Sequence, residues 1–301
     1  DPSLLDANAV RVVKTLKDAG YETYIVGGAV RDGLLGLRVS DIDVATMLVP
    51  KDVLYRLSRA AIRAVPTGLA HGTVTALTVG GPVEVTTLRR DVATDGRHAT
   101  VAFGSDWSAD AARRDFTINA LYADPASGTV FDWFDGLGDL AARRVRFIGE
   151  PLTRIAEDHL RILRFFRFHA RFGEGAPDAE GYAACVARAN DLMALSRERI
   201  AQELLKLLAV ENPVAALTTM IDGGILGPVL PEIVTTDALA RLVAREAAFA
   251  VAGDPVRRLA ALLPAEPALA ESVGARLRLS TAQTKRLGLA ATRATASPSA
   301  L

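Results

Sequence analysis

Cysteine is almost absent from this sequence, with Cys185 alone among 301 residues. A single cysteine excludes an internal disulfide and a multi-cysteine zinc site, and it fits a reducing compartment. Basic and acidic residues are equal at 35 each, so net charge does not point to nucleic acid as a partner. No run approaches the ~18 apolar residues of a membrane span, and residues 1–20 lack a signal-peptide layout. We therefore expect a cytoplasmic protein.

The two halves of the chain differ in their hydrophobic pattern. Up to Gly149, helical stretches alternate with short β-rich runs, and the turn at residues 80–82 predicts a hairpin. This half is therefore predicted to be an α+β domain with a mixed sheet, not a doubly wound parallel one. From Pro151 onward the helical spacing of leucine and alanine predicts helices alone, among them 160–172, 200–210 and 239–251. The predicted strands cover residues 21–26, 41–44, 73–79, 83–88, 99–103, 116–122 and 144–148.

A glycine pair follows the first predicted strand. Gly27 and Gly28 precede a helix predicted from about Ala29, and glycine lacks the Cβ that would hold a phosphate away from the backbone. One interpretation is a phosphate-binding turn, to which Arg31 of the same motif would contribute. The other is a plain strand-to-helix turn. The pair lacks the G-x-G-x-x-G spacing, which argues against a dinucleotide-binding oxidoreductase.

Asp41 and Asp43 are the candidate metal ligands. Residues two apart on a strand share a face, so both carboxylates project together. Like charges this close repel unless a cation lies between them, and Mg²⁺ takes one or two carboxylates together with phosphate oxygens. A strand edge in solvent is the alternative interpretation.

Glu84 is the candidate third carboxylate. It lies mid-strand, on the face opposite Val83 and Val85, and could complete a two-metal site for an in-line displacement. An exposed strand face explains its position equally well.

Arg113, Arg114 and Asp115 lead into an alternating run that includes Asn119. A guanidinium offers a planar donor fork to a triphosphate, and an ionised aspartate accepts hydrogen bonds from ribose hydroxyls. A surface salt bridge is the simpler alternative.

Asp158 and Arg161 lie three residues apart on a predicted helix. Neighbours on one face could present an acceptor and a donor to the edge of a base, or could form an ordinary intrahelical ion pair. From residue 143 to residue 171 there are eight arginines, no lysine and three acids, a local excess of five positive charges. A stripe of Arg164, Arg167 and Arg171 predicts an RNA-binding face, with a solvated polar face as the alternative.

Taken in order, these motifs resemble the class II tRNA nucleotidyltransferases, the CCA-adding enzymes, whose family also includes bacterial poly(A) polymerases. The resemblance covers roughly residues 20–210 and rests on the joint order and spacing of its motifs. These are Gly27–Asp32, Asp41–Asp43, His71–Thr73, Glu84–Thr87, Arg113–Ala120, Gly136–Asp139 and Glu157–Arg161.

The resemblance implies a head domain of the DNA polymerase β type at residues 1–149, a helical neck at 150–211 and a helical body at 212–301. It implies Mg²⁺ at Asp41 and Asp43, with Glu84 as the third catalytic carboxylate. The implied nucleotide-binding residues are Gly27, Gly28, Arg31, Arg113, Arg114, Asp115, Asn119, Asp158, Arg161 and Arg164. Within this set, Asp158 and Arg161 would bind the base of CTP or ATP.

The segment from Arg89 to Trp107 resembles the flexible loop that is associated in the family with switching from C to A addition. Its candidate residues are Asp91, Asp95 and Arg97. The last hundred residues are poor in family motifs, so we expect a short or missing tail domain.

The expected function is the Mg²⁺-dependent addition of C, C and A to the 3′ end of tRNA from CTP and ATP, with release of pyrophosphate. The alternatives are a poly(A) polymerase that uses ATP alone, a partial enzyme that adds only CC or only A, and an inactive RNA-binding scaffold. Whether an enzyme of this family adds CCA, only CC or only A depends on loop and neck geometry.

Overall fold

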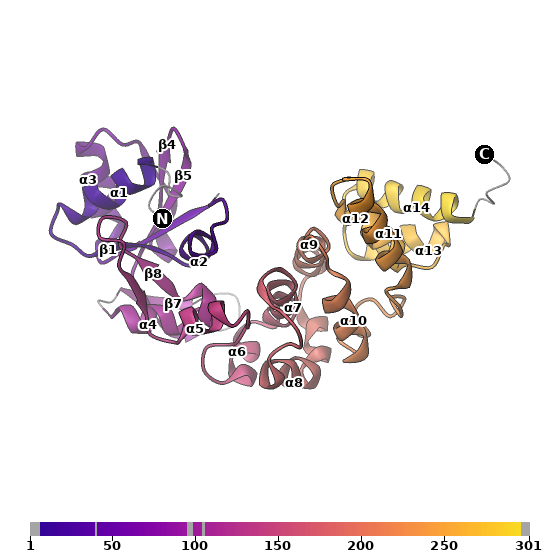
Figure 1. Ribbon diagram of the computed structural model, residues 1–301. Helices are drawn as coiled ribbons and strands as arrows, with labels where there is room; N and C mark the ends of the chain where they lie inside the picture. Colours follow the sequence, from indigo (N-terminus) through magenta and orange to yellow (C-terminus); the bar gives the residue numbers. More distant parts are fainter. Residues whose placement is uncertain (1–6, 40, 95–98, 104–105, 296–301) are drawn as a thin grey trace. The chain divides into compact units, whose positions relative to one another are not determined.

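The computed structural model describes residues 7–39, 41–94, 99–103 and 106–295. The chain divides into two compact units, Asp1–Ala142 with Arg146–Gly149 and Arg143–Val145 with Glu150–Leu301. The strands belong to the first unit, and the described residues of the second form helices only (Figure 1). Across the described ranges, no helix combines the length and the apolar character that a membrane crossing requires.

The first unit is built on a mixed seven-stranded sheet with the order β3-β4-β5-β2-β1-β8-β9. Strands β2 and β5 pair in parallel, and all other neighbours in this sheet are antiparallel, which confirms the predicted mixed sheet. The predicted hairpin joins β4 and β5, and β6 and β7 form a separate two-stranded sheet. The strands are β1 Thr23–Val26, β2 Ile42–Thr46, β3 Ala64–Gly68, β4 Thr73–Thr78, β5 Gly81–Thr87, β6 Arg89–Thr94, β7 Ala99–Phe103, β8 Leu121–Ala123 and β9 Val130–Asp132.

The two faces of the sheet have different neighbours. Successive strand residues point to opposite faces, and helices α1 and α3 lie against each other and pack on the strands (Figure 1). Tyr24 and Val26 belong to a buried cluster with Ala45 and Tyr122, and this cluster includes Ala111 of α4. The helices of this unit are α1 Ala7–Lys17, α2 Gly28–Leu34, α3 Pro50–Arg59, η2 Leu69–His71, α4 Trp107–Ala112, η3 Thr117–Asn119 and α5 Gly136–Ala141.

Two predicted strands are wrong. Residues 116–122 form the 3₁₀ helix η3 and then the short strand β8, because the Asp115 carboxylate accepts hydrogen bonds from the Phe116 backbone and the Asn119 side chain and so folds the chain into a turn. Residues 144–148 contribute only an isolated bridge between Phe116 and Phe147. Three strands were not predicted from the sequence, namely β3, β6 and β9.

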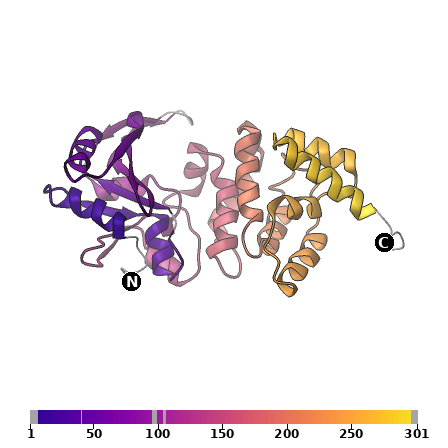
Figure 2. The ribbon, with the colours of Figure 1, turned by 90° about the horizontal axis from the view of Figure 1, so that it is seen from above.

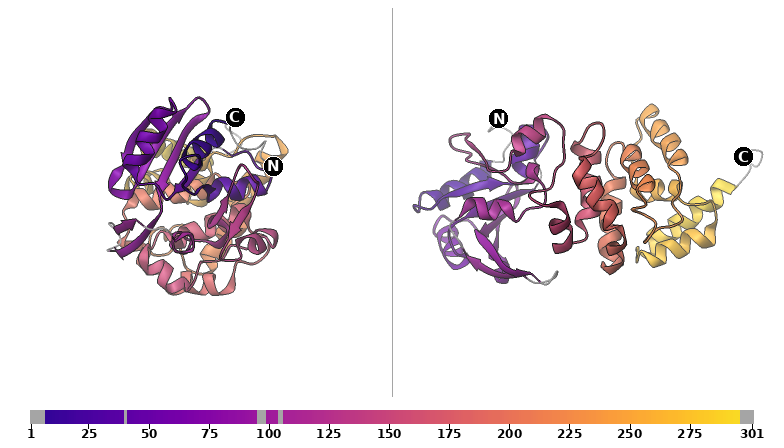
Figure 3. Two further views of the ribbon diagram at one scale, coloured as in Figure 1. Left: turned by 90° about the vertical axis from the view of Figure 1, so that its left-hand side faces the viewer. Right: turned by 90° about the horizontal axis from the view of Figure 1, so that it is seen from below.

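The second unit is a succession of helices, as predicted, and can be followed from further sides in Figure 2 and Figure 3. Asp178, Ser196 and Asp254 cap the starts of α8, α9 and α12 by accepting a hydrogen bond from a backbone N–H. The predicted helices correspond to α7, α9 and α11 within three residues at each end. The elements are α6 Pro151–Glu157, α7 Arg161–Phe172, α8 Ala179–Ala187, η4 Ala189–Ala194, α9 Arg197–Leu208, α10 Val214–Asp222, α11 Asp237–Ala248, α12 Pro255–Leu262, α13 Pro267–Arg276 and α14 Thr281–Thr295.

Candidate active site

The parallel pairing of β2 and β5 brings two carboxylates together. Asp43 lies directly opposite Glu84 in the register, while the flanking residues Val44 and Val85 are buried on the other face. Both acids line a cavity of about 180 Å³ in the first unit. The other residues that line this cavity are Val26, Val44, Ala45, Thr86, Asp110, Arg113 and Arg114.

Charge repulsion is built into this cavity. Asp43 and Glu84 are both accessible to solvent, yet desolvation by the surrounding protein raises the pKa of Asp43, and the Glu84 carboxylate raises it further, while Arg114 opposes the shift and Asp41 adds to it. Asp41 is exposed, precedes β2 and does not belong to the lining of the cavity. The described residues contain no group of three or more His, Cys, Asp or Glu side chains that could hold a metal ion. Any ion at Asp43 would therefore need further oxygen ligands from outside the protein.

Gly27 serves a close approach between two parts of the chain. It caps α2 with φ +70°, a conformation that favours glycine, and a Cβ placed on it would lie 2.9 Å from Nη1 of Arg114. The predicted turn at Gly27 and Gly28 is therefore present. Its local role is to admit the Arg114 guanidinium.

Three of the predicted nucleotide-binding side chains are buried against one another. Arg31 donates from Nε to Asp32 at 2.8 Å and from Nη1 to the side-chain oxygen of Asn119. The Asn119 amide in turn donates to Asp115 at 2.9 Å. Arg31, Asp115 and Asn119 are each less than a tenth exposed, so in this structure they tie α2 to η3 beside the cavity.

Arg113 and Arg114 form one wall of the cavity, the arginine wall, and Asp110 and Tyr122 bind these arginines. Asp110 accepts hydrogen bonds from Nε of Arg113 at 2.8 Å and from the Tyr122 hydroxyl at 2.6 Å. Nε of Arg114 donates to the same hydroxyl at 3.2 Å. Burial opposes ionisation of Asp110, but Arg113, Arg114 and the Tyr122 hydroxyl together hold the pKa of Asp110 below its usual value. Asp110 is therefore an ionised carboxylate that pairs with two cavity arginines.

The structure does not place Asp158 and Arg161 on one helix face. Asp158 ends α6 in an extended conformation, and α7 begins at Arg161. Both oxygens of Asp158 accept from Nη2 of Arg199 on α9, at 3.0 and 2.8 Å. Arg161 donates to the Arg154 carbonyl at 2.9 Å and pairs with Glu157 at 2.5 Å. The prediction of helical i,i+3 neighbours is therefore wrong, because the helix breaks between the two residues.

The arginine stripe of α7 is partly packed against its own helix. The guanidinium groups of Arg164 and Arg167 lie over the Phe168 ring, and that of Arg171 lies over Phe172. Nε of Arg167 also donates to Glu203, a buried carboxylate of α9. Arg167 is therefore a partner of Glu203 rather than an exposed cation as predicted.

The predicted flexible loop coincides in part with the β6–β7 hairpin. Asp91 lies on β6, opposite Val101 of β7. Asp95 and Arg97 lie outside the residues that the structure describes.

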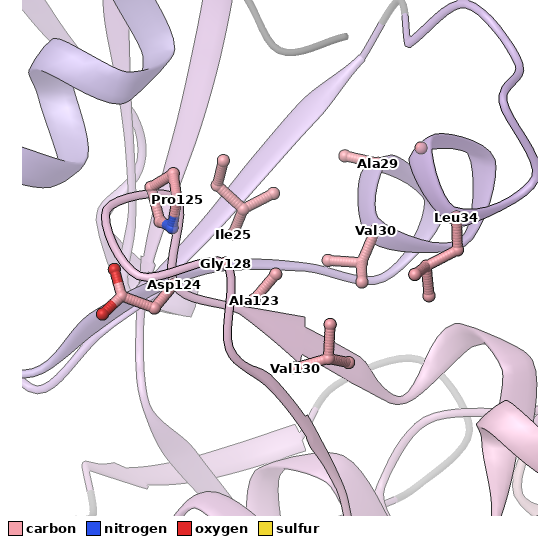
Figure 4. A pocket seen from close by; sticks show the side chains of 10 residues that line it. Ile25, Ala29, Val30, Leu34, Ala123, Asp124, Pro125, Gly128 and Val130 are labelled. Atoms are coloured by element: carbon pink, nitrogen blue, oxygen red, sulfur yellow. The ribbon is translucent and has the colours of Figure 1, made fainter. Parts of the chain in front are cut away.

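A second pocket of the first unit is apolar. It measures about 110 Å³, and Val30 and Leu34 of α2 face Ala123 and Val130 across it (Figure 4). Its one carboxylate, Asp124, pairs with Lys17 at 2.6 Å. The lining of this apolar pocket offers no cationic group to a phosphate, whereas the Asp43 cavity has Arg113 and Arg114 in its lining.

Comparison with known proteins places this cavity within a recognised domain. Residues 23–146 match the family described as "Poly A polymerase head domain", and residues 177–236 match "Probable RNA and SrmB- binding site of polymerase A". The CCA-adding enzyme of Bacillus stearothermophilus, solved in complex with CTP, is 32% identical and superposes with a TM-score of 0.77. The alignment covers 93% of this chain and 68% of that one. The chain belongs to the tRNA nucleotidyltransferase/poly(A) polymerase family.

Curated members of the family show the same likeness over part of their length. The mouse CCA tRNA nucleotidyltransferase 1, mitochondrial, is 46% identical over 195 residues, which are 64% of this chain and 45% of that protein. The CCA-adding enzyme of Levilactobacillus brevis is 41% identical over 216 residues, which are 71% of this chain and 53% of that protein. The chain thus spans about half the length of the curated nucleotidyltransferases it matches.

Three residues around the predicted site residues were missed from the sequence. Asp110 could have been found, because it precedes Arg113 and Arg114 by three and four residues, the spacing of helical ion pairs. Tyr122 and Arg199 gave no such signal. Their partners, Asp110 and Asp158, lie 12 and 41 residues away in the chain.

Proposed function

We propose that this chain carries the template-independent nucleotidyl transfer that adds C, C and A to the 3′ end of tRNA from CTP and ATP. The observation that carries the proposal is the pairing of Asp43 with Glu84 in a cavity walled by Arg113 and Arg114. Two acids and two guanidinium groups suit a triphosphate and its counter-ion. The names of the relatives, CCA-adding enzyme and CCA tRNA nucleotidyltransferase, support the choice of substrates.

In the proposed reaction the 3′ oxygen of the RNA attacks the α-phosphorus of the nucleotide. The bond from that phosphorus to the bridging oxygen breaks, and pyrophosphate leaves with the electron pair. Arg113 and Arg114 bind the phosphates and take up the negative charge of the leaving group. Glu84 positions the attacking hydroxyl, and its place beside Asp43 on the neighbouring strand sets the line of attack.

Asp43 and Asp41 would hold Mg²⁺, the cofactor expected for this reaction. The residues fit such an ion, because the repulsion that raises the pKa of Asp43 is relieved by a cation and phosphate oxygens supply the missing ligands. When bound, Mg²⁺ lowers the pKa of the 3′ hydroxyl and neutralises part of the triphosphate charge.

Asp158 and Arg161 are proposed to read the base, with Arg164 as a further nucleotide contact. In the structure Asp158 pairs with Arg199 and Arg161 with Glu157, so the two enter the proposal as a separate acceptor and a separate donor. A carboxylate acceptor and a guanidinium donor can match the edge of cytosine or adenine. We keep five further residues as proposed nucleotide-binding residues, namely Gly27, Gly28, Arg31, Asp115 and Asn119. In the structure their contacts lie beside Arg113 and Arg114.

Arg164 and Arg171 on α7 are proposed to contact RNA phosphates, and residues 150–211 and 212–301 are proposed as neck and body. A cytoplasmic location remains a prediction from composition. The role of Asp91, Asp95 and Arg97 in switching from C to A likewise remains a prediction.

The deciding experiment incubates the protein with tRNA that ends at the discriminator base, with CTP, ATP or both, and sequences the 3′ ends. Ordered addition of C, C and A supports the proposal. Extension of unrelated RNA with ATP alone indicates a poly(A) polymerase, and CC alone or A alone indicates a partial enzyme. No incorporation by a folded protein that binds RNA indicates a scaffold.

Asp43→Ala is the matched loss-of-function variant for that assay. We expect CTP incorporation to fall at least a hundredfold, because the carboxylate opposite Glu84 is removed. Unchanged incorporation would overturn the assignment of this cavity.

A further inference from the structure

Asp110 is a buried acid on the cavity wall for which the reaction above has no direct use. Its side chain is 2% exposed, and it lies on α4, which follows the β6–β7 hairpin. A buried carboxylate is costly unless it is paired and hydrogen-bonded. The partners of Asp110 are two arginines of the cavity and a tyrosine hydroxyl, so its contacts point at the site rather than away from it.

Arg114 is held from three directions. Its Nε donates to the Tyr122 hydroxyl at 3.2 Å, Nη2 lies 3.6 Å from Asp110, and Nη1 donates to the Asn119 carbonyl at 3.4 Å. The guanidinium also lies over the Tyr122 ring, with 5.3 Å from its central carbon to the ring centre. A guanidinium restrained in this way keeps one orientation toward the cavity, which lowers the ordering cost of binding a phosphate.

The charges of the wall explain why an acid is needed there. Arg113 and Arg114 together carry two positive charges close to Asp43, and the ionised Asp110 offsets one of them from behind. Arg114 already interacts electrostatically with Asp43. Without Asp110, the Arg114 guanidinium would be drawn toward Asp43 and away from the position that the tyrosine and the acid now define.

We propose that Asp110 and Tyr122 are positioning residues, which hold the Arg113 and Arg114 guanidinium groups on the cavity wall so that they receive the phosphates of the incoming nucleotide. This inference rests on the proposed function, which assigns the cavity to a nucleoside triphosphate. Because every nucleotide carries the same triphosphate, the effect of these residues is independent of the base.

Tyr122→Phe is the first test, because it removes only the hydroxyl that links Asp110 to Arg114. The KM for CTP and the KM for ATP should both rise about tenfold, the loss expected for one charge-assisted hydrogen bond, with kcat within about threefold. The preference between CTP and ATP should not change. Calorimetric titration of CTP without an RNA primer, where no turnover occurs, should show the same tenfold weakening.

Asp110→Asn should weaken CTP binding at least as much, and Asp110→Glu should restore part of it because the charge returns. Asp139→Asn is the matched control. Asp139 is also fully buried and bound by an arginine, Arg146, at 2.9 Å, but it lines no part of the cavity. This control should lower the melting temperature and leave CTP affinity unchanged.

Several outcomes would overturn the proposal. The proposal fails if folded Tyr122→Phe binds CTP as tightly as the wild type. If Asp110→Asn does not fold, Tyr122→Phe alone decides the question. An equal loss of CTP affinity in Asp139→Asn would show a merely structural effect. If the wild type binds CTP and Asp43→Ala is inactive while the Tyr122 variant binds normally, only this inference fails. If Asp43→Ala keeps full activity, the proposed function itself fails.

Discussion

At the scale of single residues, the cavity depends on the absence of a side chain at Gly27 and on the acidic side chains of Asp43 and Glu84. Gly27 combines a positive φ with the absence of a Cβ, and Arg114 occupies the space that this absence leaves. Asp43 stands opposite Glu84, although two acids side by side destabilise a fold that has no cation between them. Asp43 and Glu84 therefore oppose local stability in favour of the geometry of the site.

Gly27→Ala should separate backbone strain from loss of the arginine position. Gly27 has φ +70° and ψ −126°, outside the left-handed helical region, so an alanine there is strained and also displaces the Arg114 guanidinium, and both stability and CTP affinity should fall. Gly36→Ala is the control, because Gly36 has φ +68° and no atom within 4 Å of its Cβ position. Thermal melting should show a loss for both variants, and CTP titration a loss for Gly27→Ala alone. Equal CTP affinities would contradict this account.

Asp43→Asn should raise the melting temperature of the metal-free protein while it abolishes activity. The pKa of Asp43 is raised above its ordinary value of 3.8, so the ionised group destabilises the fold above that pH. The advantage of the variant should therefore be present at pH 7 and disappear as the pH falls toward 4. Melting curves in EDTA across this range measure it, and an unchanged or lower melting temperature at pH 7 would refute the repulsion.

At the scale of elements, the sequence predicts the helices and strands that follow a local hydrophobic pattern. It does not predict the segments whose conformation depends on side-chain hydrogen bonds. The alternation in β2 and β5, the hairpin after β4 and the long apolar faces of α7 and α9 were predicted, since each is periodic over its own length. The run after Asp115 looked like a strand but is folded by that carboxylate into η3. Asp158 looked helical but is held in an extended conformation by Arg199, 41 residues away.

The end of α9 provides a test of an element held by one side chain. Arg258 is buried and donates to the carbonyls of Leu208 and Val210 near the C-terminus of α9, and to Glu246 at 2.8 Å. Arg258→Met should lower the free energy of unfolding by about 1–3 kcal/mol, because the buried carbonyls lose their donor while Glu246 keeps Arg257 as a partner. Denaturant unfolding measures the loss.

The control for this variant is an exposed arginine of the same unit. Arg278 pairs with Glu198 at 2.6 Å, with its side chain 68% exposed, so Arg278→Met should change the free energy of unfolding by less than about 1 kcal/mol. A loss below 1 kcal/mol for Arg258→Met would show that the helix end does not depend on this residue.

At the scale of the whole molecule, a net charge of zero hides an uneven distribution. The excess of arginine between residues 143 and 171 was evident from the sequence, but the partners of these arginines were not. Arg167 pairs with buried Glu203, and Arg161 pairs with Glu157, so acidic partners within the second unit neutralise part of the positive charge. For the candidate site, the sequence pointed to Asp43, Glu84, Arg113 and Arg114, and the structure brings these four residues to one cavity. Asp110 and Tyr122, which bind the two arginines, became evident only in the folded chain.

Salt dependence of RNA binding should distinguish these arginines. Arg171 is exposed, so Arg171→Gln should reduce the slope of log affinity against log salt by about 0.7–0.9, one phosphate contact. Arg167→Gln should leave the slope unchanged and lower the melting temperature, because it breaks the pair with Glu203. Filter binding of tRNA over a salt series provides the measurement, and the reverse pattern would contradict the assignment.

The parallel pairing of β2 with β5 also has a consequence for how the candidate active site forms during folding. Asp43 and Glu84 are separated in the chain by α3, β3 and β4, so they meet only when two distant segments pair at the centre of the sheet. Non-local strand pairing of this kind is slow, because chain entropy is lost before the contacts form. During synthesis, a chain that has not yet reached Glu84 and Arg114 contains Asp41 and Asp43 but lacks part of the cavity lining. If the cavity binds a nucleotide as proposed, the onset of binding would report on completion of the sheet.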